Sequence, residues 1–450
     1  MQRSVTHLAP QNGSYARALG AFRSARLAAC LRAARDDVSP PARTLCARAL
    51  LRLGRAADSR YALRGIWLDN DVVRGEVAML QSAAAARLGE DAAAERLLLT
   101  ARAYVFSTDM PALEAELEYY GASAALERGE LQQAVAACRR LLRVAFSGKA
   151  NDYVVPLRHL RARAFQLLGF VRAARGNYAA QATLAFKASD EFGRSRVPDV
   201  FEEAQYAAEL AVVTLDLDLA DREPGVRSLV EAVRWTDAIA NLRFKSYEAL
   251  CWCAALRGDY YAAFRFLRRA GAGATVPQEI TIGADRALLT CALEQRLIAA
   301  EEIGHALDLA ERFDWEQSVR EDRTALVRLA QAAAPLETVR ARAALDRYAN
   351  LQPTSLPYVA HNDVLARAEE AFASGVVARA EGDIRQATDH LLVAFESWNG
   401  IGFAWRAARA ALELAEIDGS DTFHECVRRE RKMRASSWFA KRAAMADRSA

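Results

Sequence analysis

The sequence lacks the features that mark membrane, secreted or nucleic-acid-binding chains. Its formal net charge is only +3 over 450 residues, which gives no general case for a nucleic-acid partner. The seven cysteines are odd in number and lie inside helical patterns, so we expect reduced, buried thiols in a cytoplasmic protein. The apolar run ALCWCAAL, 249–256, is far too short to span a bilayer, and the N-terminus has no apolar segment typical of a signal peptide.

Motifs that carry chemistry are also missing. No G-x-x-x-x-G-K-[ST] phosphate-binding loop occurs, and the glycine-rich stretch at 271–275 follows no predicted strand. The side chains of Cys251 and Cys253 would point about 200° apart on a helix and cannot coordinate the same metal ion. The histidines are scattered along the chain, at His7, His159, His305, His361, His390 and His424. We therefore expect no enzyme activity, no cofactor and no metal site.

The sequence is rich in helix-forming residues, and glycines interrupt the helical runs at regular intervals. Hydrophobic residues make up 52% of the chain, Ala, Leu and Arg dominate, and the 11 prolines fall mostly between helical runs. Similar glycines recur between these runs, separated by 35, 40 and 47 residues and then by about two and three times 41. They are Gly54, Gly89, Gly129, Gly176, Gly258 and Gly382. A period of this length with helical patterning on both sides predicts stacked helical hairpins.

Each glycine and the residues after it explain why one helix ends and the next begins at this point. The glycine can take the left-handed conformation that ends the first helix, and Asn177, Asp259 or Asp383 can cap the second. Glu130 is a poorer cap. A small residue stands five positions after most of these glycines and a larger apolar one nine positions after, on the same helical face. The small residue allows close approach within a hairpin, and the larger one fills the space toward the next hairpin.

This spacing resembles the tetratricopeptide (TPR) repeat, W-x2-L-G-x2-Y-x3-G-x-Y-x2-A-x3-F-x2-A. The matching residues are Leu168, Gly169, Gly176 and Tyr178 in one repeat, Gly258, Tyr260, Ala263, Leu267 and Ala270 in another, and Gly375, Gly382, Ala387, Leu391 and Ala394 in a third. The resemblance implies an all-α, right-handed superhelical solenoid of about ten to eleven antiparallel hairpins. The longer spacing and the stretch FESWNGIGFAWRAARAALELAEIDG resemble the TPR regions of bacterial signalling regulators of the MalT type.

Periodicity places the individual hairpins and two irregular connections. We expect one repeat array over 1–434, with possible hinges near 271–283 and 350–363, followed by a basic capping segment at 435–450. The hairpins are predicted at 14–36, 42–68, 72–105, 110–146, 151–193, 199–239, 242–271, 280–312, 315–350, 359–398 and 400–434. The basic end is interrupted by acidic residues, so we interpret it as a solvated terminal helix and not as a nucleic-acid-binding segment.

In a TPR array the first helix of each hairpin lines the concave groove. Positions six, ten and thirteen residues before each signature glycine should therefore face inward, and the candidates for ligand binding are Arg48, Glu116, Tyr119, Arg163, Gln166, Phe170, Lys245, Glu248, Trp252, Glu369 and Phe372. Aromatic residues interleaved with charges suit an extended peptide. The same residues could instead pack against neighbouring helices.

Two functions agree with these observations. The first is a non-catalytic scaffold that binds a protein or peptide in its groove in bacterial signalling or regulation. The second is a stand-alone sensor module of a MalT/LuxR-type transcriptional regulator that binds a small effector.

Overall fold

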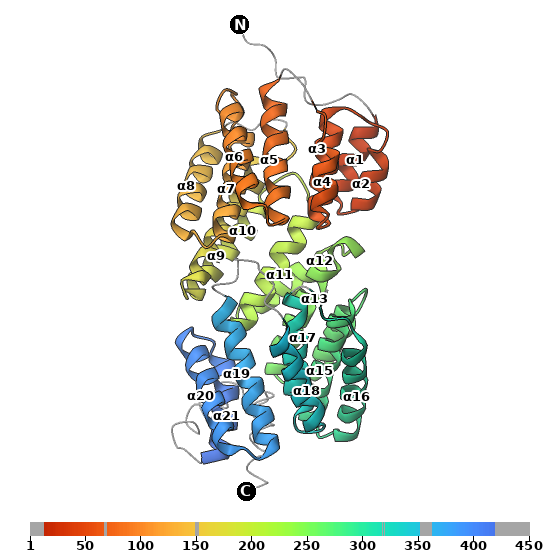
Figure 1. The fold of residues 1–450 in the computed structure, drawn as a ribbon, viewed down its shortest axis with the longest axis vertical. Coiled ribbons are helices and arrows are strands. Elements are labelled where there is room, and N and C mark those ends of the chain that lie inside the picture. The colour runs from red at the N-terminus through yellow and green to blue at the C-terminus, as the bar shows by residue number, and fades with distance from the viewer. Residues whose placement is uncertain are drawn as a thin grey trace. The chain divides into compact units, whose positions relative to one another are not determined.

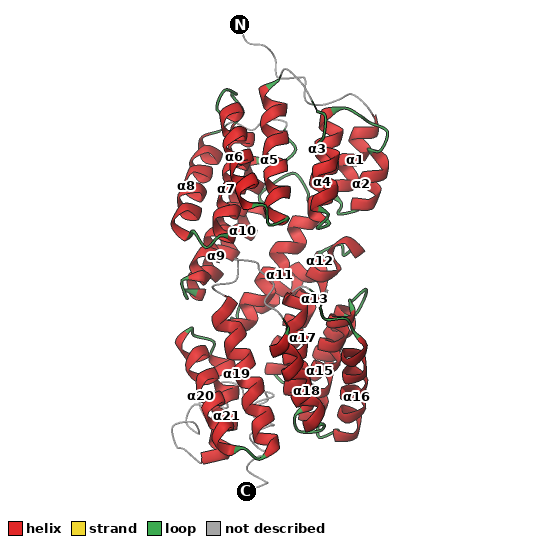
Figure 2. Cartoon of the chain, viewed as in Figure 1, coloured by secondary structure: helices red, strands yellow, loops and turns green. Residues whose placement is uncertain are grey.

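The computed structural model describes residues 13–66, 70–148, 153–316, 318, 320–351 and 362–418. These residues form helices joined by short turns, with no strand among them (Figures 1 and 2). Consecutive helices pack closely against each other as hairpins. The prediction of an all-α array of helix hairpins is confirmed. No helix in the described part of the chain is both long and apolar enough to cross a membrane.

The chain divides into two compact units, and the division falls within one helix, between residues 206 and 207. The first unit takes the described residues up to 206 together with residues 233–239. Its helices are α1 (Gly13–Arg23), α2 (Leu27–Ala33), α3 (Pro40–Arg52), α4 (Ala56–Ala62), α5 (Asp71–Arg87), α6 (Asp91–Val105), α7 (Pro111–Glu127), α8 (Leu131–Ser147), α9 (Leu157–Ala174), α10 (Tyr178–Gly193), the start of α11 (Val200–Asp216) and a short 3₁₀ helix, η1 (Asp237–Ile239).

The second unit takes the rest of α11 and the described residues of 217–232 and from 240 onward. Its helices are α12 (Glu223–Ala232), α13 (Ala240–Leu256), α14 (Tyr260–Ala270), α15 (Val276–Ala292), α16 (Arg296–Arg312), α17 (Arg320–Ala333), α18 (Thr338–Asn350), α19 (Asn362–Glu381), α20 (Ile384–Gly400) and α21 (Ala404–Asp418). Helix α21 is the first helix of the last predicted hairpin. The rest of that hairpin and the basic segment at 435–450 lie outside the described residues.

The turns between paired helices take the conformation that the glycines predicted. All six signature glycines have positive φ, from 74° at Gly54 and Gly176 to 85° at Gly382. The side chain of Asp259 accepts a hydrogen bond of 3.0 Å from the backbone N–H of Ala262, and Asn177 and Asp383 cap their helices in the same way. Glu130 makes no side-chain cap bond. The left-handed glycine and the short acceptor side chain therefore fix where α10, α14 and α20 begin.

One predicted irregular connection is shorter than expected. The stretch 271–283 was predicted to be irregular, but α15 begins at Val276. Thr275 and Gln278 form a reciprocal capping box at this helix start, and Pro277 occupies the first turn, where its missing N–H costs nothing. The hinge proposed here stays a prediction. The hinge near 350–363 lies largely outside the described residues.

The close approach of two helices within a hairpin can be tested at a glycine that occurs twice at the same motif position. A Cβ at Gly375 would lie 2.7 Å from Cγ of Leu391, whereas a Cβ at Gly169 would meet nothing closer than 3.5 Å. Gly375→Ala should therefore lower the free energy of unfolding by about 1–3 kcal/mol through overpacking. Gly169→Ala should be neutral or stabilising by up to about 1 kcal/mol, because alanine favours the helix. Urea unfolding of both variants checks this, and equal effects would contradict the packing of α19 on α20.

Candidate functional site

The candidate site consists, in each unit, of side chains that the first helices of successive hairpins send toward one another. We call this surface the inner face of the unit. In the first unit it is formed by residues of α3, α5, α7, α9 and the start of α11, and in the second unit by residues of α11, α13, α15, α17, α19 and α21.

The centre of the first inner face is a buried arginine. Arg48 of α3 is only 5% exposed. Its Nη2 donates hydrogen bonds of 2.8 Å to Glu76 of α5 and to Glu116 of α7, and a further bond joins Nη1 to Glu116. Nη2 also lies 2.9 Å from the hydroxyl of Tyr153, which donates to Glu116 over 2.7 Å. One guanidinium thus connects three hairpins and the segment before α9.

The pKa values of the two carboxyl groups around Arg48 are shifted in opposite directions. Burial raises the pKa of Glu76 above its ordinary value, and Arg48 offsets this only in part. Burial also acts on Glu116, but Arg48 and the hydroxyl of Tyr153 outweigh it and hold the pKa of this carboxyl below its usual range. Burial raises the pKa of Tyr153 well above that of a free tyrosine. Glu116 is therefore more readily ionised than Glu76.

A second cluster of the first unit lies where α3, α9 and α11 meet. Arg52 binds both carboxylate oxygens of Asp199, over 3.1 and 2.7 Å. Arg163 of α9 donates from Nε to Glu202 over 2.7 Å, and its guanidinium lies over the ring of Tyr119, 5.0 Å from the centroid. These charge-assisted bonds hold the end of the first unit to its third helix.

This cluster also contains a possible metal-ligand set. One ligand atom each from His159, Asp199 and Glu202 lies within 4.8 Å of the others. However, Nε2 of His159 is 3.0 Å from the carbonyl oxygen of Val197, and burial lowers the pKa of this histidine. A metal ion would have to displace Arg52 and Arg163 from the two carboxylates. We therefore interpret the set as part of a structural ion-pair network.

The second inner face is built around two stacked tryptophans. The rings of Trp252 of α13 and Trp405 of α21 lie 6.2 Å apart with an interplanar angle of 20°, and they are 0% and 1% exposed. The guanidinium of Arg409 lies 6.0 and 5.7 Å from the two ring centroids and 4.7 Å from that of Phe372. That of Arg406 lies 4.9 Å from the ring of Trp405. The contacts bring the last described helix against a helix four hairpins earlier in the chain.

Ion pairs surround this aromatic stack. Arg406 donates to Asp216 of α11 over 2.9 Å, across 190 residues of sequence, and also pairs with Glu369 of α19. Arg328 of α17 lies 3.6 Å from Glu248 and 3.5 Å from Asp285. The carboxylates of this network therefore come from α11, α13, α15 and α19, and the guanidiniums from α17 and α21.

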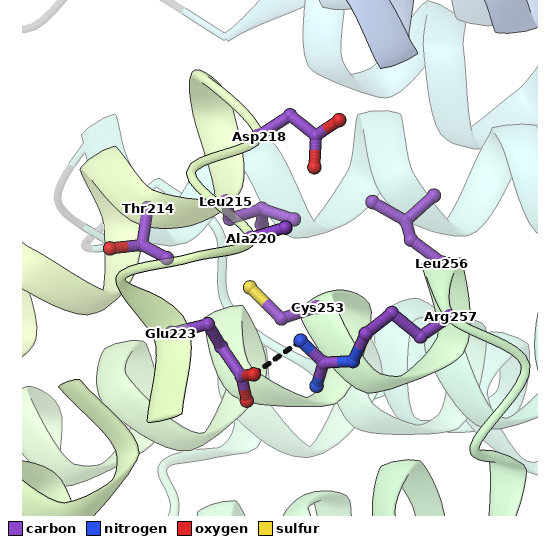
Figure 3. A pocket seen from close by; sticks show the side chains of 8 residues that line it. All are labelled: Thr214, Leu215, Asp218, Ala220, Glu223, Cys253, Leu256 and Arg257. Carbon is purple, nitrogen blue, oxygen red and sulfur yellow. Dashed lines mark hydrogen bonds and ion pairs between the residues drawn. The ribbon is translucent and has the colours of Figure 1, made fainter. Parts of the chain in front are cut away.

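A small hollow lies between α11, α12 and α13, outside both networks (Figure 3). It measures about 250 Å³, including space that is open to solvent, and the ion pair of Glu223 with Arg257 lies along one side. Cys253 reaches into it, but burial and the neighbouring Glu223 raise the pKa of this thiol to about 12. A thiol that stays protonated at neutral pH is a poor nucleophile, so the hollow does not form a reactive site.

The structure brings together most, but not all, of the predicted site residues. Arg48 contacts Glu116, and Arg163 contacts Tyr119. Gln166 is buried, and the half-buried Phe170 packs on the apolar cluster of α7, α8 and α9. In the second unit Glu248, Trp252, Glu369 and Phe372 belong to the network described above. Lys245 is exposed.

Several residues of the inner faces were not predicted. They are Arg52, Glu76, Tyr153, Asp199, Glu202, Asp216, Asp285, Arg328, Trp405, Arg406 and Arg409. Glu76 stands thirteen residues before Gly89, so the same count would have found it. The hairpins that contain Asp285 and Arg328 have no signature glycine to count from, and Tyr153 lies between hairpins.

Comparisons with known proteins do not assign this chain to a family. No protein-family model matches the sequence, and no curated protein matches it. Among solved structures, the APC/C hetero-tetramer Cut9–Hcn1 is similar with 12% identity and a TM-score of 0.32, over 94% of this chain and 90% of the other. Naa15/Naa10 bound to HypK-THB is similar with 14% identity and a TM-score of 0.20, over 94% and 75%.

Proposed function

We propose that the chain is a non-catalytic scaffold that binds a protein or peptide partner along the inner faces of its units, in bacterial signalling or regulation. The observation that supports this is the convergence of side chains from successive first helices on the inner face of each unit. Its centre is buried, whereas Glu248 and Glu369 stay about one fifth exposed and Lys245 is exposed. A buried centre surrounded by a polar, solvent-accessible rim is the usual arrangement in a protein–protein interface.

A charge reversal at the rim tests this proposal. Lys245→Glu should reduce recovery of a co-purified partner at least about tenfold, because a reversed rim charge repels the complementary group. Arg268→Glu on α14 is the matched control, since Arg268 is equally exposed but lies on a second helix. Both variants should keep the wild-type melting temperature. Partner recovery that falls equally in both variants, or in neither, would contradict binding at the inner face.

A second candidate function follows from the likeness of the stretch 395–419 to regulators of the MalT type. This stretch forms the end of α20 and α21, and α21 places Trp405 and Arg406 on the second inner face. A sensor module would bind a small effector beside these residues. A melting temperature that rises with individual metabolites would favour this function, whereas flat melting curves with a peptide partner would favour the scaffold.

A further inference from the structure

Two carboxylates of the second inner face depend on the same arginine. Glu248 of α13 and Asp285 of α15 both face Arg328 of α17, at 3.6 and 3.5 Å. At these distances neither contact is a strong hydrogen bond. Asp285 is fully buried, and Glu248 is about one fifth exposed at the rim. One guanidinium thus compensates two largely desolvated carboxylates.

Besides Arg328, the side chain of Trp252 and the charge of Arg409 favour the ionised form of Asp285, and the charge of Arg406 favours that of Glu248. The groups that face the two carboxylates are Arg328, Arg406 and Arg409, together with the carboxylate of Asp216. Arg406 is already engaged by Asp216 and by Glu369. The network therefore contains four carboxylates and three guanidiniums. The neighbouring Cys251 stays neutral, because burial raises the pKa of its thiol well above the ordinary value.

We propose that Glu248 and Asp285 share one proton while the inner face is closed, and that loss of this proton loosens the contact between α13 and α21. Burial, with Asp285 as the neighbouring charge, raises the pKa of Glu248 to about 7, and burial raises the pKa of Asp285 as well. A second negative charge at this place is poorly compensated by Arg328 and has to be hydrated.

The position of Trp252 links the protonation of this carboxylate pair to the packing of α21. Trp252 follows Glu248 by one helical turn, and the guanidinium of Arg328 lies 5.6 Å from its ring centroid. The other side of the contact is Trp405, which stacks on Trp252. Water that enters to hydrate Glu248 and Asp285 therefore arrives beside the stacked pair, and a shift of Arg328 toward the carboxylates removes a cation from the ring of Trp252.

The direction of the pH dependence follows from the two states. In the closed state Glu248 binds a proton with a pKa of about 7, and in the open state its pKa returns to the ordinary value of 4.5. Rising pH therefore favours opening between these two values, by about tenfold per pH unit, and has no further effect above pH 7. The closed inner face is most stable in mild acid.

Hydrogen exchange of the full chain tests the proposal without any partner, so the result does not depend on the proposed function. After correction for the intrinsic exchange rate, amide protection in α21 and the second half of α13 should fall about 40-fold between pH 5 and pH 7. Glu248→Gln mimics the protonated side chain and should abolish this change. Glu301→Gln, at an exposed position of α16, is the matched control and should keep it.

A further variant separates the shared proton from an effect of Glu248 alone. Asp285→Asn should also flatten the pH profile, because Glu248 then keeps Arg328 as its own partner. The proposal is overturned if protection of α21 in the wild type does not change between pH 5 and pH 7. It is equally overturned if the profile stays as steep in Glu248→Gln and in Asp285→Asn as in the wild type.

Discussion

Replacing Arg48 with methionine is expected to lower the free energy of unfolding by about 3–5 kcal/mol, one of the two largest effects that we predict. The substitution roughly keeps the volume of the side chain but leaves Glu76 and Glu116 buried without their cation. It also removes a hydrogen-bond donor from the hydroxyl of Tyr153. Urea unfolding followed by circular dichroism measures the loss.

An exposed ion pair in the same unit provides the control. Arg60 of α4 pairs with Glu90 over 2.6 Å, but both side chains are about two fifths exposed. Arg60→Met should therefore cost less than about 1 kcal/mol. If Arg48→Met were no more destabilising than Arg60→Met, the buried position of Arg48 between three hairpins would be wrong.

Replacing Trp405 with alanine is expected to destabilise the second unit by about 3–5 kcal/mol. The change removes the ring that stacks on Trp252 and that faces Arg406 and Arg409. Protection of α21 against hydrogen exchange should fall together with the midpoint of urea unfolding. Tyr261→Ala is the control, because this tyrosine is 83% exposed on α14 and should change stability by less than about 0.5 kcal/mol.

A small effect of Trp405→Ala, close to that of Tyr261→Ala, would mean that α21 does not pack against α13 in solution. The expected loss also limits how mutations at the inner face can be used. Trp252 is fully buried, so Trp252→Ala would disturb the fold and any partner binding together. A substitution at the exposed Lys245 avoids that complication.

The hairpins could be predicted from the sequence because their signals are local. Gly258 and Asp259 are consecutive residues that end one helix and begin the next, and both take the predicted roles. The same logic failed at 271–283, where the two nearby glycines suggested an irregular connection. There a capping box of Thr275 and Gln278 starts the helix early, which periodicity alone did not reveal.

The inner faces could be predicted only in part, because their contacts join residues far apart in the sequence. The count from a signature glycine placed Arg48 and Glu116 on the inner face, but it could not show that they pair across 68 residues. The pair of Arg406 and Asp216 spans 190 residues and depends on how several hairpins turn relative to one another. Those turns arise from packing between hairpins, for which the repeat pattern has no separate signal.

The central claim is that the chain's own side chains close the inner face of each unit. The most direct measurement is a double-mutant cycle of Asp216→Asn and Arg406→Met, whose wild-type side chains meet over 2.9 Å. The two helices lie at opposite ends of the second unit's sequence, so coupling requires the closed arrangement. We expect a coupling free energy of unfolding of about 1–3 kcal/mol. Strictly additive effects of the two substitutions would contradict the account.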